Sequence, residues 1–352
     1  MKSFSILVSL LLLSGVLYAD DRLGLPPLTI PADNPQSPQK IALGQQLFND
    51  RRLSGDGTVS CASCHPATRA FSDGRQVAQG IGGQRGIRNT PTVVNAAFYS
   101  SLFVDGRRPS LETQALDPLL NPIEHGLSDD RAILAVIRQD PQYRRQFKQV
   151  FAVAPQQITP QHIAQAIASY ERTLIYGDSP FDRYFFGGDK TALSPAAARG
   201  LNIFRRKGNC ANCHEISWNN ALFSDNRFYN IGIGYQRVAP LVERYGDKLA
   251  AHIDNNRQIT AMQRSELGRF NLTHTIADIG QFKTPSLRNV ALTGPYMHDG
   301  SLETLAEVIE YYDRGGHPNP FLDPAIFPLM LTAQEKTDLV EFLKALTSRK
   351  FK

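Results

Sequence analysis

All the cysteines of this chain fall in two copies of one pentapeptide. The first copy is Cys61-Ala-Ser-Cys64-His65 and the second is Cys210-Ala-Asn-Cys213-His214. In this spacing the two thiols sit about one helical turn apart, so both can form thioethers with the edge of one porphyrin while the adjacent imidazole reaches the iron. Two disulfides or a Cys/His zinc site would not need histidine after the second cysteine both times. The pattern therefore predicts two covalently attached haems c, with His65 and His214 as iron ligands.

The first residues have the layout of an export signal. Lys2 precedes an apolar run from Phe4 to Leu17, and Ala19 stands before two acidic residues. This layout predicts a signal peptide over residues 1–19, cleaved after Ala19. A retained membrane anchor is the alternative, but the run is shorter than the roughly 20 apolar residues that a spanning helix needs. We therefore expect a periplasmic protein with no membrane span in the mature chain.

The composition fits a folded protein with a modest positive charge. The 352 residues are 42% hydrophobic and 20% charged, which leaves room for two core-forming domains. The net charge of +5 falls to +4 when Lys2 leaves with the signal peptide. This balance permits an acidic redox partner. No basic run is interleaved with aromatic residues, which argues against nucleic acid as a partner.

Several short segments recur in the two halves of the chain. The recurring pairs, in chain order, are Gly44–Phe48 with Gly200–Phe204, Thr90–Asn95 with Thr284–Asn289, Asp105-Gly106 with Asp299-Gly300, and Ser110–Thr113 with Ser301–Thr304. The order of these segments relative to the pentapeptide is the same in both halves. The chain is therefore expected to be an internal duplication, with both halves built on one plan.

Helix signals are frequent and strand signals are few. Thr159-Pro160 and Ser194-Pro195 each place a capping residue before a proline at the first helical position. One apolar helical face follows at Ile163, Ile167, Tyr170 and Leu174. A last helix is expected from about Thr332 to Leu346, with a buried side formed by Leu339, Phe342, Leu343 and Leu346.

These signals predict a mostly α fold with two cytochrome c-like haem domains and long loops. The expected domains are residues 20–182 and 183–352, which meet near Asp178–Asp182. The segment from Trp218 to Gln281 is expected to form polar loops.

From about Gln39 to the C-terminus, the chain resembles the bacterial di-haem cytochrome c peroxidases, and within them the MauG-like branch. The motifs that carry the resemblance are the two pentapeptides, Arg88–Thr92, Asp105–Arg107, Lys283–Thr293, Pro295–Gly300 and Tyr311–Gly316. The resemblance implies that the N-terminal haem reacts with hydrogen peroxide and that the C-terminal haem passes electrons to it or shares its oxidising equivalents.

The resemblance also implies the residues on the open side of the N-terminal haem. Gln114, Pro118 and Glu124 stand in register with the conserved glutamine, proline and acid of the family. Cleavage of the O–O bond needs a group that takes a proton from one oxygen and returns it to the other, and a carboxylate can do both. Glu124 is the candidate for this role. Without the resemblance, it would be taken for a solvated loop acid beside Pro122.

A calcium ion between the domains is a further implication of the resemblance. The family holds it through an asparagine side chain and the backbone carbonyls of a threonine and a proline, and these positions fall on Asn89, Thr293 and Pro295. Oxygen ligands of this kind suit calcium. Family members often form homodimers, but no segment of this chain marks an interface.

Two departures from the ordinary peroxidases indicate the MauG-like branch. The loop position that holds an iron-blocking histidine in those enzymes is Ile81 here, and no histidine lies between His65 and His125. The N-terminal iron is therefore expected to be five-coordinate and accessible. Tyr312, nineteen residues after Thr293, stands where the peroxidases use a methionine ligand for the C-terminal iron and where MauG-like proteins use tyrosine. Met297 is the rival ligand.

A third departure affects the path between the haems. The family usually has a tryptophan directly before Asp-Gly-Arg, and this chain has Val104 there. Phe103 or Tyr99 could serve as a relay, or both could be ordinary packing residues. His298 lies in a repeated, motif-rich turn, which predicts a contact with a haem propionate or with a group that supports a haem ligand.

Three functions remain open at this stage. The first is a peroxidase that takes electrons from a small periplasmic cytochrome c or cupredoxin. The second is a MauG-like enzyme that uses peroxide to oxidise side chains of a protein substrate. The third is a di-haem electron carrier without enzymatic activity, in which Gln114 and Glu124 would have no role and both irons would be six-coordinate.

Overall fold

The structure, a computed structural model, describes residues 21–253 and 258–351. The predicted signal peptide lies outside these residues. In the described part the chain is mostly helical, and its one sheet pairs β1 (Phe228–Tyr229) with β2 (Phe282–Lys283) in antiparallel fashion. No helix among the described residues is long and apolar enough to cross a membrane. The predicted mostly α fold is confirmed.

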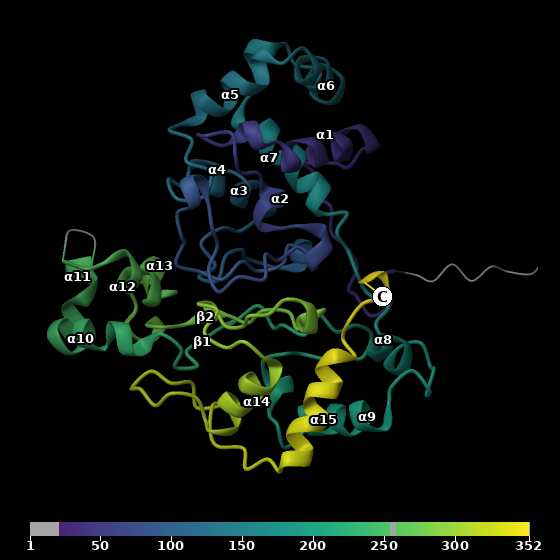
Figure 1. The fold of residues 1–352 in the computed structure, drawn as a ribbon, viewed down its shortest axis with the longest axis vertical. Coiled ribbons are helices and arrows are strands. Elements are labelled where there is room, and N and C mark those ends of the chain that lie inside the picture. Colours follow the sequence, from purple (N-terminus) through teal and green to yellow (C-terminus); the bar gives the residue numbers. More distant parts are fainter. Residues whose placement is uncertain (1–20, 254–257, 352) are drawn as a thin grey trace, which may run out of the picture.

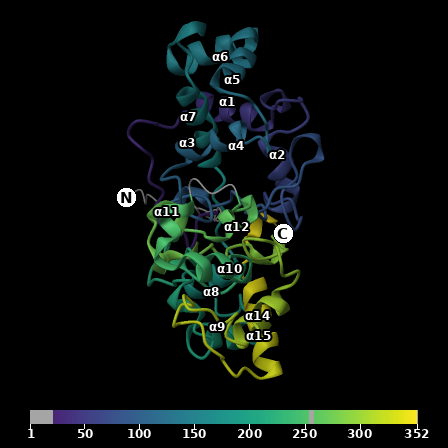
Figure 2. The ribbon, with the colours of Figure 1, turned by 90° about the vertical axis from the view of Figure 1, so that its left-hand side faces the viewer.

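The helices form two lobes, one above the other in Figure 1, and the turned view in Figure 2 shows the same division. The upper lobe contains α1 (Pro38–Asn49), α2 (Cys61–Cys64), α3 (Leu111–Gln114), α4 (Asp117–Leu120), α5 (Asp130–Gln139), α6 (Pro141–Phe151) and α7 (Pro160–Glu171). The lower lobe contains α8 (Pro180–Phe185), α9 (Pro195–Arg205), α10 (Tyr235–Tyr245), α11 (Leu249–Ile253), α12 (Ala261–Glu266), α13 (Phe270–Thr273), α14 (Leu305–Asp313) and α15 (Ala333–Lys344).

A close crossing of two helices organises each lobe. In the upper lobe α1 packs on α7, and a Cβ atom at Gly44 would lie 1.9 Å from the carbonyl oxygen of Ala166. In the lower lobe α9 packs on α15, and a Cβ atom at Gly200 would lie 2.0 Å from the carbonyl oxygen of Asp338. Only glycine allows the two backbones to approach this closely.

The helix boundaries follow the predicted caps. Thr159 accepts from the His162 N–H at the start of α7, and Ser194 accepts from the Ala197 N–H at the start of α9. α15 begins after Thr332, and its predicted apolar side is buried in the lower core. α7 ends at Glu171, so Leu174 lies beyond the helix although it is buried.

The expectation of polar loops from Trp218 to Gln281 is wrong, because β1 and α10–α13 form there. These elements enclose a small apolar core of their own, which contains Tyr235, Val238, Leu241, Leu249, Ile253, Ile259, Leu267, Phe270 and Ile279. Pro240 stands inside α10, and a proline at an interior position normally argues against a helix. The burial of Val238 and Leu241 compensates for the hydrogen bond that the proline removes.

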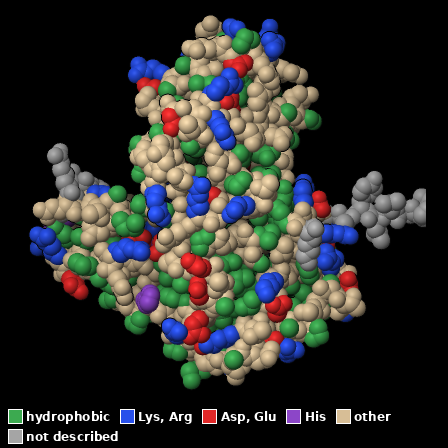
Figure 3. Space-filling view, viewed as in Figure 1, with side chains coloured by type: hydrophobic (Ala, Val, Ile, Leu, Met, Phe, Trp, Pro, Cys, Tyr) green, Lys and Arg blue, Asp and Glu red, His purple; other side chains and the backbone are tan. Residues whose placement is uncertain are grey.

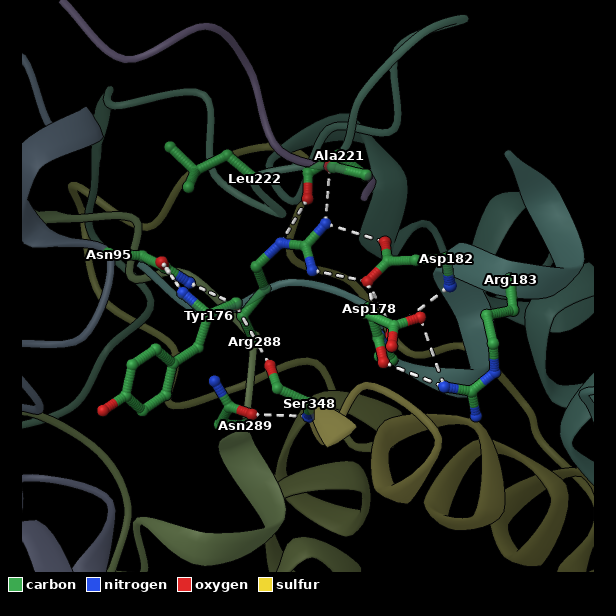
Figure 4. A network of polar contacts seen from close by, with 12 residues as sticks. Asn95, Tyr176, Asp178, Asp182, Arg183, Ala221, Leu222, Arg288, Asn289 and Ser348 are labelled. Carbon is green, nitrogen blue, oxygen red and sulfur yellow. Dashed lines mark hydrogen bonds and ion pairs between the residues drawn. The ribbon is translucent and has the colours of Figure 1, made fainter. Parts of the chain in front are cut away.

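A buried polar network ties the lobes together where the chain passes from one to the other (Figure 4). Arg288 donates to both carboxylate oxygens of Asp182, at 2.8 and 2.9 Å, and both side chains are almost fully buried. Arg288 also donates to the carbonyl oxygen of Gly24, so the segment at the start of the described chain is held in the same network. Ser348, close to the end of the chain, donates through its N–H to Asn289 and through its hydroxyl to the carbonyl oxygen of Tyr176.

Replacement of Asp182 by alanine should destabilise the protein strongly. The substitution leaves the Arg288 guanidinium buried without its carboxylate, and breaking a buried pair in this way costs about 3–5 kcal/mol. The free energy of unfolding in urea measures the effect. Lys344→Ala is the control, because it removes an exposed partner of Glu341 and should cost about 0–1 kcal/mol. Equal losses in the two variants would contradict the role given to the buried pair.

Candidate haem sites

The two pentapeptides adopt similar local structures. The first forms α2, and the His65 N–H donates to the carbonyl oxygen of Cys61 at 2.9 Å. The second begins with a short 3-10 helix over Cys210–Asn212, and the His214 N–H donates to the carbonyl oxygen of Cys210 at 2.9 Å. All four thiols are free of disulfide bonds. Each turn therefore presents two thiols and an imidazole from one short segment.

The two imidazole rings are held in the same way. His65 Nδ1 lies 3.0 Å from the carbonyl oxygen of Phe71, and His214 Nδ1 lies 2.9 Å from that of Phe223. A carbonyl oxygen can only accept, so Nδ1 carries the proton and the Nε2 lone pair stays available. Burial lowers the pKa of both histidines, which favours the neutral form that an iron ligand needs.

These features fit haem c at both positions. The thiols are unpaired, each imidazole is neutral and oriented, and an aromatic ring stands beside each imidazole. The ring centroids of Phe48 and His65 are 6.4 Å apart, and those of Phe204 and His214 are 6.5 Å apart. A Cys/His zinc site or a structural disulfide would leave this repeated orientation without a purpose.

The residues predicted for the open side of the first haem come from neighbouring elements. Gln114 ends α3, Pro118 lies in α4, and Glu124 lies in the turn that follows. The turn is closed onto α4, because the His125 N–H donates to the carbonyl oxygen of Pro118 at 3.2 Å. All three predicted side chains are half-buried.

Glu124 is a carboxyl group in a partly desolvated position. Burial raises its pKa, and the charge of Asp117 adds to the rise. Arg107 and a hydrogen bond of 2.7 Å from the Asn121 amide work in the opposite direction. The Glu124 charge also raises the pKa of the Cys61 thiol, so the carboxyl group lies near the first pentapeptide.

The loop that lacks the blocking histidine packs against this turn. The Ile81 N–H donates to the carbonyl oxygen of Glu124 at 3.0 Å, and the Ile81 side chain closes on Gly126. A Cβ atom at Gly80 would lie 1.8 Å from the carbonyl oxygen of Ile123. The loop is therefore fitted tightly onto the turn, and the side chain that it brings there is apolar.

Tyr312 lies in α14 beside the second pentapeptide. Burial raises the pKa of its phenol, and the charges of Cys210 and Cys213 raise it further, which shows that these groups are close. Met297, the rival ligand, has a left-handed backbone (φ 70°) in a turn that faces the upper lobe. In that turn the carbonyl oxygen of His298 accepts from the Asn89 N–H at 3.0 Å.

The three positions predicted for calcium lie along this contact between the lobes. The Asn89 side chain donates to the carbonyl oxygen of Arg75 at 2.8 Å, and its N–H donates to the carbonyl oxygen of His298, a few residues beyond Thr293 and Pro295 in the chain. No cluster of three or more histidine, cysteine or acidic side chains suited to a metal occurs in residues 21–253 and 258–351. A metal at this contact would therefore be held by amide and carbonyl oxygens.

Of the two aromatic residues weighed as a relay, Tyr99 is the one that reaches the other lobe. Its hydroxyl accepts from the Ser286 N–H at 2.9 Å, and the Lys283 ammonium lies 3.5 Å from the centre of its ring. Phe103 is instead covered by the guanidinium of Arg107 at 3.3 Å. Val104 contributes only its carbonyl oxygen, which accepts from the Lys283 N–H at 2.7 Å.

The carbonyl oxygens that orient the histidines were not predicted from the sequence. A signal for them exists, because Phe71-Ser72-Asp73 recurs as Phe223-Ser224-Asp225. The number of residues between the histidine and this segment differs between the two halves, so a comparison of the halves at constant spacing misses it. The His298 Nε2 atom lies 2.9 Å from the buried Glu266 carboxylate, so this nitrogen has a protein partner.

Comparison with known proteins agrees with this geometry. Residues 38–191 match the sequence profile of the family described as di-haem cytochrome c peroxidase. Cytochrome-c peroxidase IdrP1 of Pseudomonas sp. strain SCT is 38% identical over 330 residues, which span 92% of this chain and 84% of that protein. The methylamine utilization protein MauG of Methylorubrum extorquens is 36% identical, over 90% of this chain and 80% of that protein.

A solved structure gives the same result. The crystal structure of a MauG-like protein associated with microbial copper homeostasis has a TM-score of 0.77 and 36% sequence identity, over 93% of this chain and 95% of that chain. Fold and relatives together define a haem-dependent oxidoreductase of the c-type cytochrome class. The chain belongs to the di-haem cytochrome c peroxidase family, whose cofactor is haem c.

Proposed function

We propose that this protein is a periplasmic di-haem peroxidase that reacts with hydrogen peroxide at the haem of residues 20–182. The haem of residues 183–352 passes it electrons from a small redox protein. The observation that carries this proposal is the chemical difference between the two sites: the Glu124 carboxyl group lies near Cys61, whereas the Tyr312 phenol lies near Cys210 and Cys213.

The difference is informative because the two halves share so many local contacts. The Ser72 hydroxyl donates a hydrogen bond to the carbonyl oxygen of Thr90 at 3.0 Å, and the Ser224 hydroxyl donates one to the carbonyl oxygen of Thr284 at 2.7 Å. Asn95 and Asn289 both have a left-handed backbone with φ 62°. These pairs support an internal duplication in which the two sites were later adapted to different tasks.

In the first site Cys61, Cys64 and His65 would hold haem c, which would supply the redox chemistry of peroxide reduction. The ionised Glu124 takes a proton from one peroxide oxygen and returns it to the oxygen that leaves as water. Gln114, at the end of α3, is placed to orient the peroxide through its amide. The adjoining loop presents the apolar Ile81, whose side chain has no atom that could bind a haem iron.

In the second site Tyr312 would complete the coordination of the iron together with His214. A tyrosine ligand stabilises ferric iron, which lowers the reduction potential relative to a methionine ligand. One calcium ion, held by Asn89 and by the carbonyls of Thr293 and Pro295, would brace the contact between the lobes.

A MauG-like activity is the second candidate function, in which oxidising equivalents pass to side chains of a partner protein. Tyr312 beside the second pentapeptide and the absence of a histidine in the Ile81 loop favour it. Several Lys and Arg side chains lie across the waist between the lobes in Figure 3, and a positive surface of this kind would attract an acidic partner.

Glu124→Gln should slow the reaction with peroxide by about 10²–10⁴-fold, because glutamine cannot take up the proton. Both haems should remain attached. The wild-type rate should fall as the pH is lowered through the pKa of Glu124, which burial places above the usual value of 4.5, since only the ionised form accepts a proton. Stopped-flow absorbance measures both effects.

The control for this variant is Asp130→Asn, which neutralises an exposed acid at the start of α5 and should leave the rate unchanged. A Glu124→Gln protein with the wild-type rate and the same acid limb would remove Glu124 from the mechanism.

Electron counting separates the two candidate functions. A peroxidase should oxidise two molecules of a one-electron donor, such as a reduced cupredoxin or cytochrome c, for each peroxide consumed, because reduction of peroxide to water takes two electrons. Absorbance of the donor and a peroxide electrode give the ratio. Peroxide consumption with no donor oxidation would favour the MauG-like activity instead.

A further inference from the structure

A buried carboxyl group in the upper lobe has one oxygen without a hydrogen-bond partner. It belongs to Glu171, the last residue of α7, whose exposed fraction is 5%. Its Oε2 atom is fully enclosed and no group among the described residues bonds to it. Leaving a buried carboxylate oxygen unpaired is costly, so the position needs an explanation other than stability.

The nearest cation does not neutralise this group. Arg172 directs its guanidinium to the Glu112 carboxylate, at 2.6 and 2.9 Å. Lys40, on α1, reaches the same network through Asn34, which also donates to Glu112. The short contacts of this buried network are therefore made to Glu112, while on Glu171 the Arg172 charge acts only at longer range to lower its pKa and the Glu112 charge raises it.

The end of α7 lies close to the first pentapeptide, because Tyr170 and Cys61 pack against the same apolar core. After burial, the Glu171 charge is the largest cause of the raised pKa of the Cys61 thiol, ahead of the smaller effect of Glu124. The Glu171 charge also raises the pKa of Tyr170, which packs on Phe48 beside His65. Burial raises the pKa of Glu171 itself to about 8, so the group can exchange a proton near neutral pH.

The lower lobe has an apolar residue at the matching position. The carbonyl oxygen of Ala166 contacts Gly44 in the same way as the carbonyl oxygen of Asp338 contacts Gly200. The Asn95 N–H donates to the carbonyl oxygen of Leu174 as the Asn289 N–H donates to that of Leu346. The carbonyl-bearing residues of these contacts, Ala166 with Asp338 and Leu174 with Leu346, are separated by the same number of residues. The same separation relates Glu171 to Leu343, which is buried in the lower apolar core. Asp73 near His65, in contrast, has an acidic counterpart in Asp225.

We infer that Glu171 is a positioning residue of the N-terminal haem site, whose carboxylate stabilises the oxidised haem and takes up a proton when the haem is reduced. When one electron enters the site from the small redox donor, Glu171 takes one proton from water, so the charge of the pocket stays constant. Oxidation reverses both transfers. The C-terminal site has Leu343 and lacks this coupling. The inference rests on the proposed assignment of the two sites.

Potentiometric titration of the intact di-haem protein between pH 5 and pH 9 tests the inference. The haem that binds cyanide is the open one, so its absorbance changes can be assigned. Its reduction potential should fall as the pH rises, because the ionised carboxylate favours the ferric form, while the other potential should change less. A charge at this depth should alter the ferric/ferrous ratio by about tenfold, which corresponds to about 59 mV for one electron.

In the Glu171→Gln variant, the reduction potential of the open haem should be the same at both ends of the pH range. At low pH its potential should equal the wild-type value, since Glu171 is then protonated, and at high pH it should be higher. Glu171→Leu, which copies the lower lobe, should behave in the same way. Leu343→Met is the matched control and should leave both potentials and their pH dependence unchanged.

The titration of the wild-type protein tests the inference about Glu171 even if a variant loses haem. An open haem with a pH-independent potential, or a pH dependence that survives Glu171→Gln, would overturn the inference. If the peroxide reaction is intact in that case, the proposed function stands without it. If neither haem binds cyanide, the proposed open site fails first.

Discussion

The contact between two helix backbones at a glycine is the constraint on which each lobe depends. At Gly44 and at Gly200 no Cβ atom fits, because the carbonyl oxygen of the crossing helix occupies its place. The crossing brings Phe48 and Phe204 beside the histidines. It also fixes which residues of the second helix face the pentapeptide. A larger side chain at either glycine would separate the helices and disturb the haem pocket along with the core.

Because the two lobes share the same local backbone arrangement around the histidine, the side chains that differ between them indicate different roles. Both histidines bond to a phenylalanine carbonyl, and both asparagines after the Thr-Pro segment adopt the left-handed conformation. The sites differ in the groups around this arrangement. Acidic side chains, Glu124 and Glu171, lie near the first pentapeptide, whereas Tyr312 and Leu343 belong to the second lobe. Carboxyl groups near one pentapeptide and a phenol near the other suit the proposed division between peroxide chemistry and electron transfer.

Local patterns predicted the parts of the fold that local physics determines. The pentapeptides, the Thr159 and Ser194 caps and the buried side of α15 could be read from residue type and spacing. α10 was missed because Pro240 masks a helix that tertiary burial stabilises. Glu171 was missed for a similar reason: it follows an apolar helical face, and only the packing of α7 on α1 buries it in the same lobe core that Cys61 contacts. The match with Leu343 required the three-dimensional offset between the lobes.

The most direct test of an open iron in one site and a capped iron in the other is an electron paramagnetic resonance spectrum of the resting ferric protein. One high-spin and one low-spin signal of equal intensity are expected, because the proposed function gives the first iron no ligand from the Ile81 loop and gives the second iron Tyr312. Two low-spin signals would contradict the open site and, with it, the assignment of peroxide chemistry to the upper lobe.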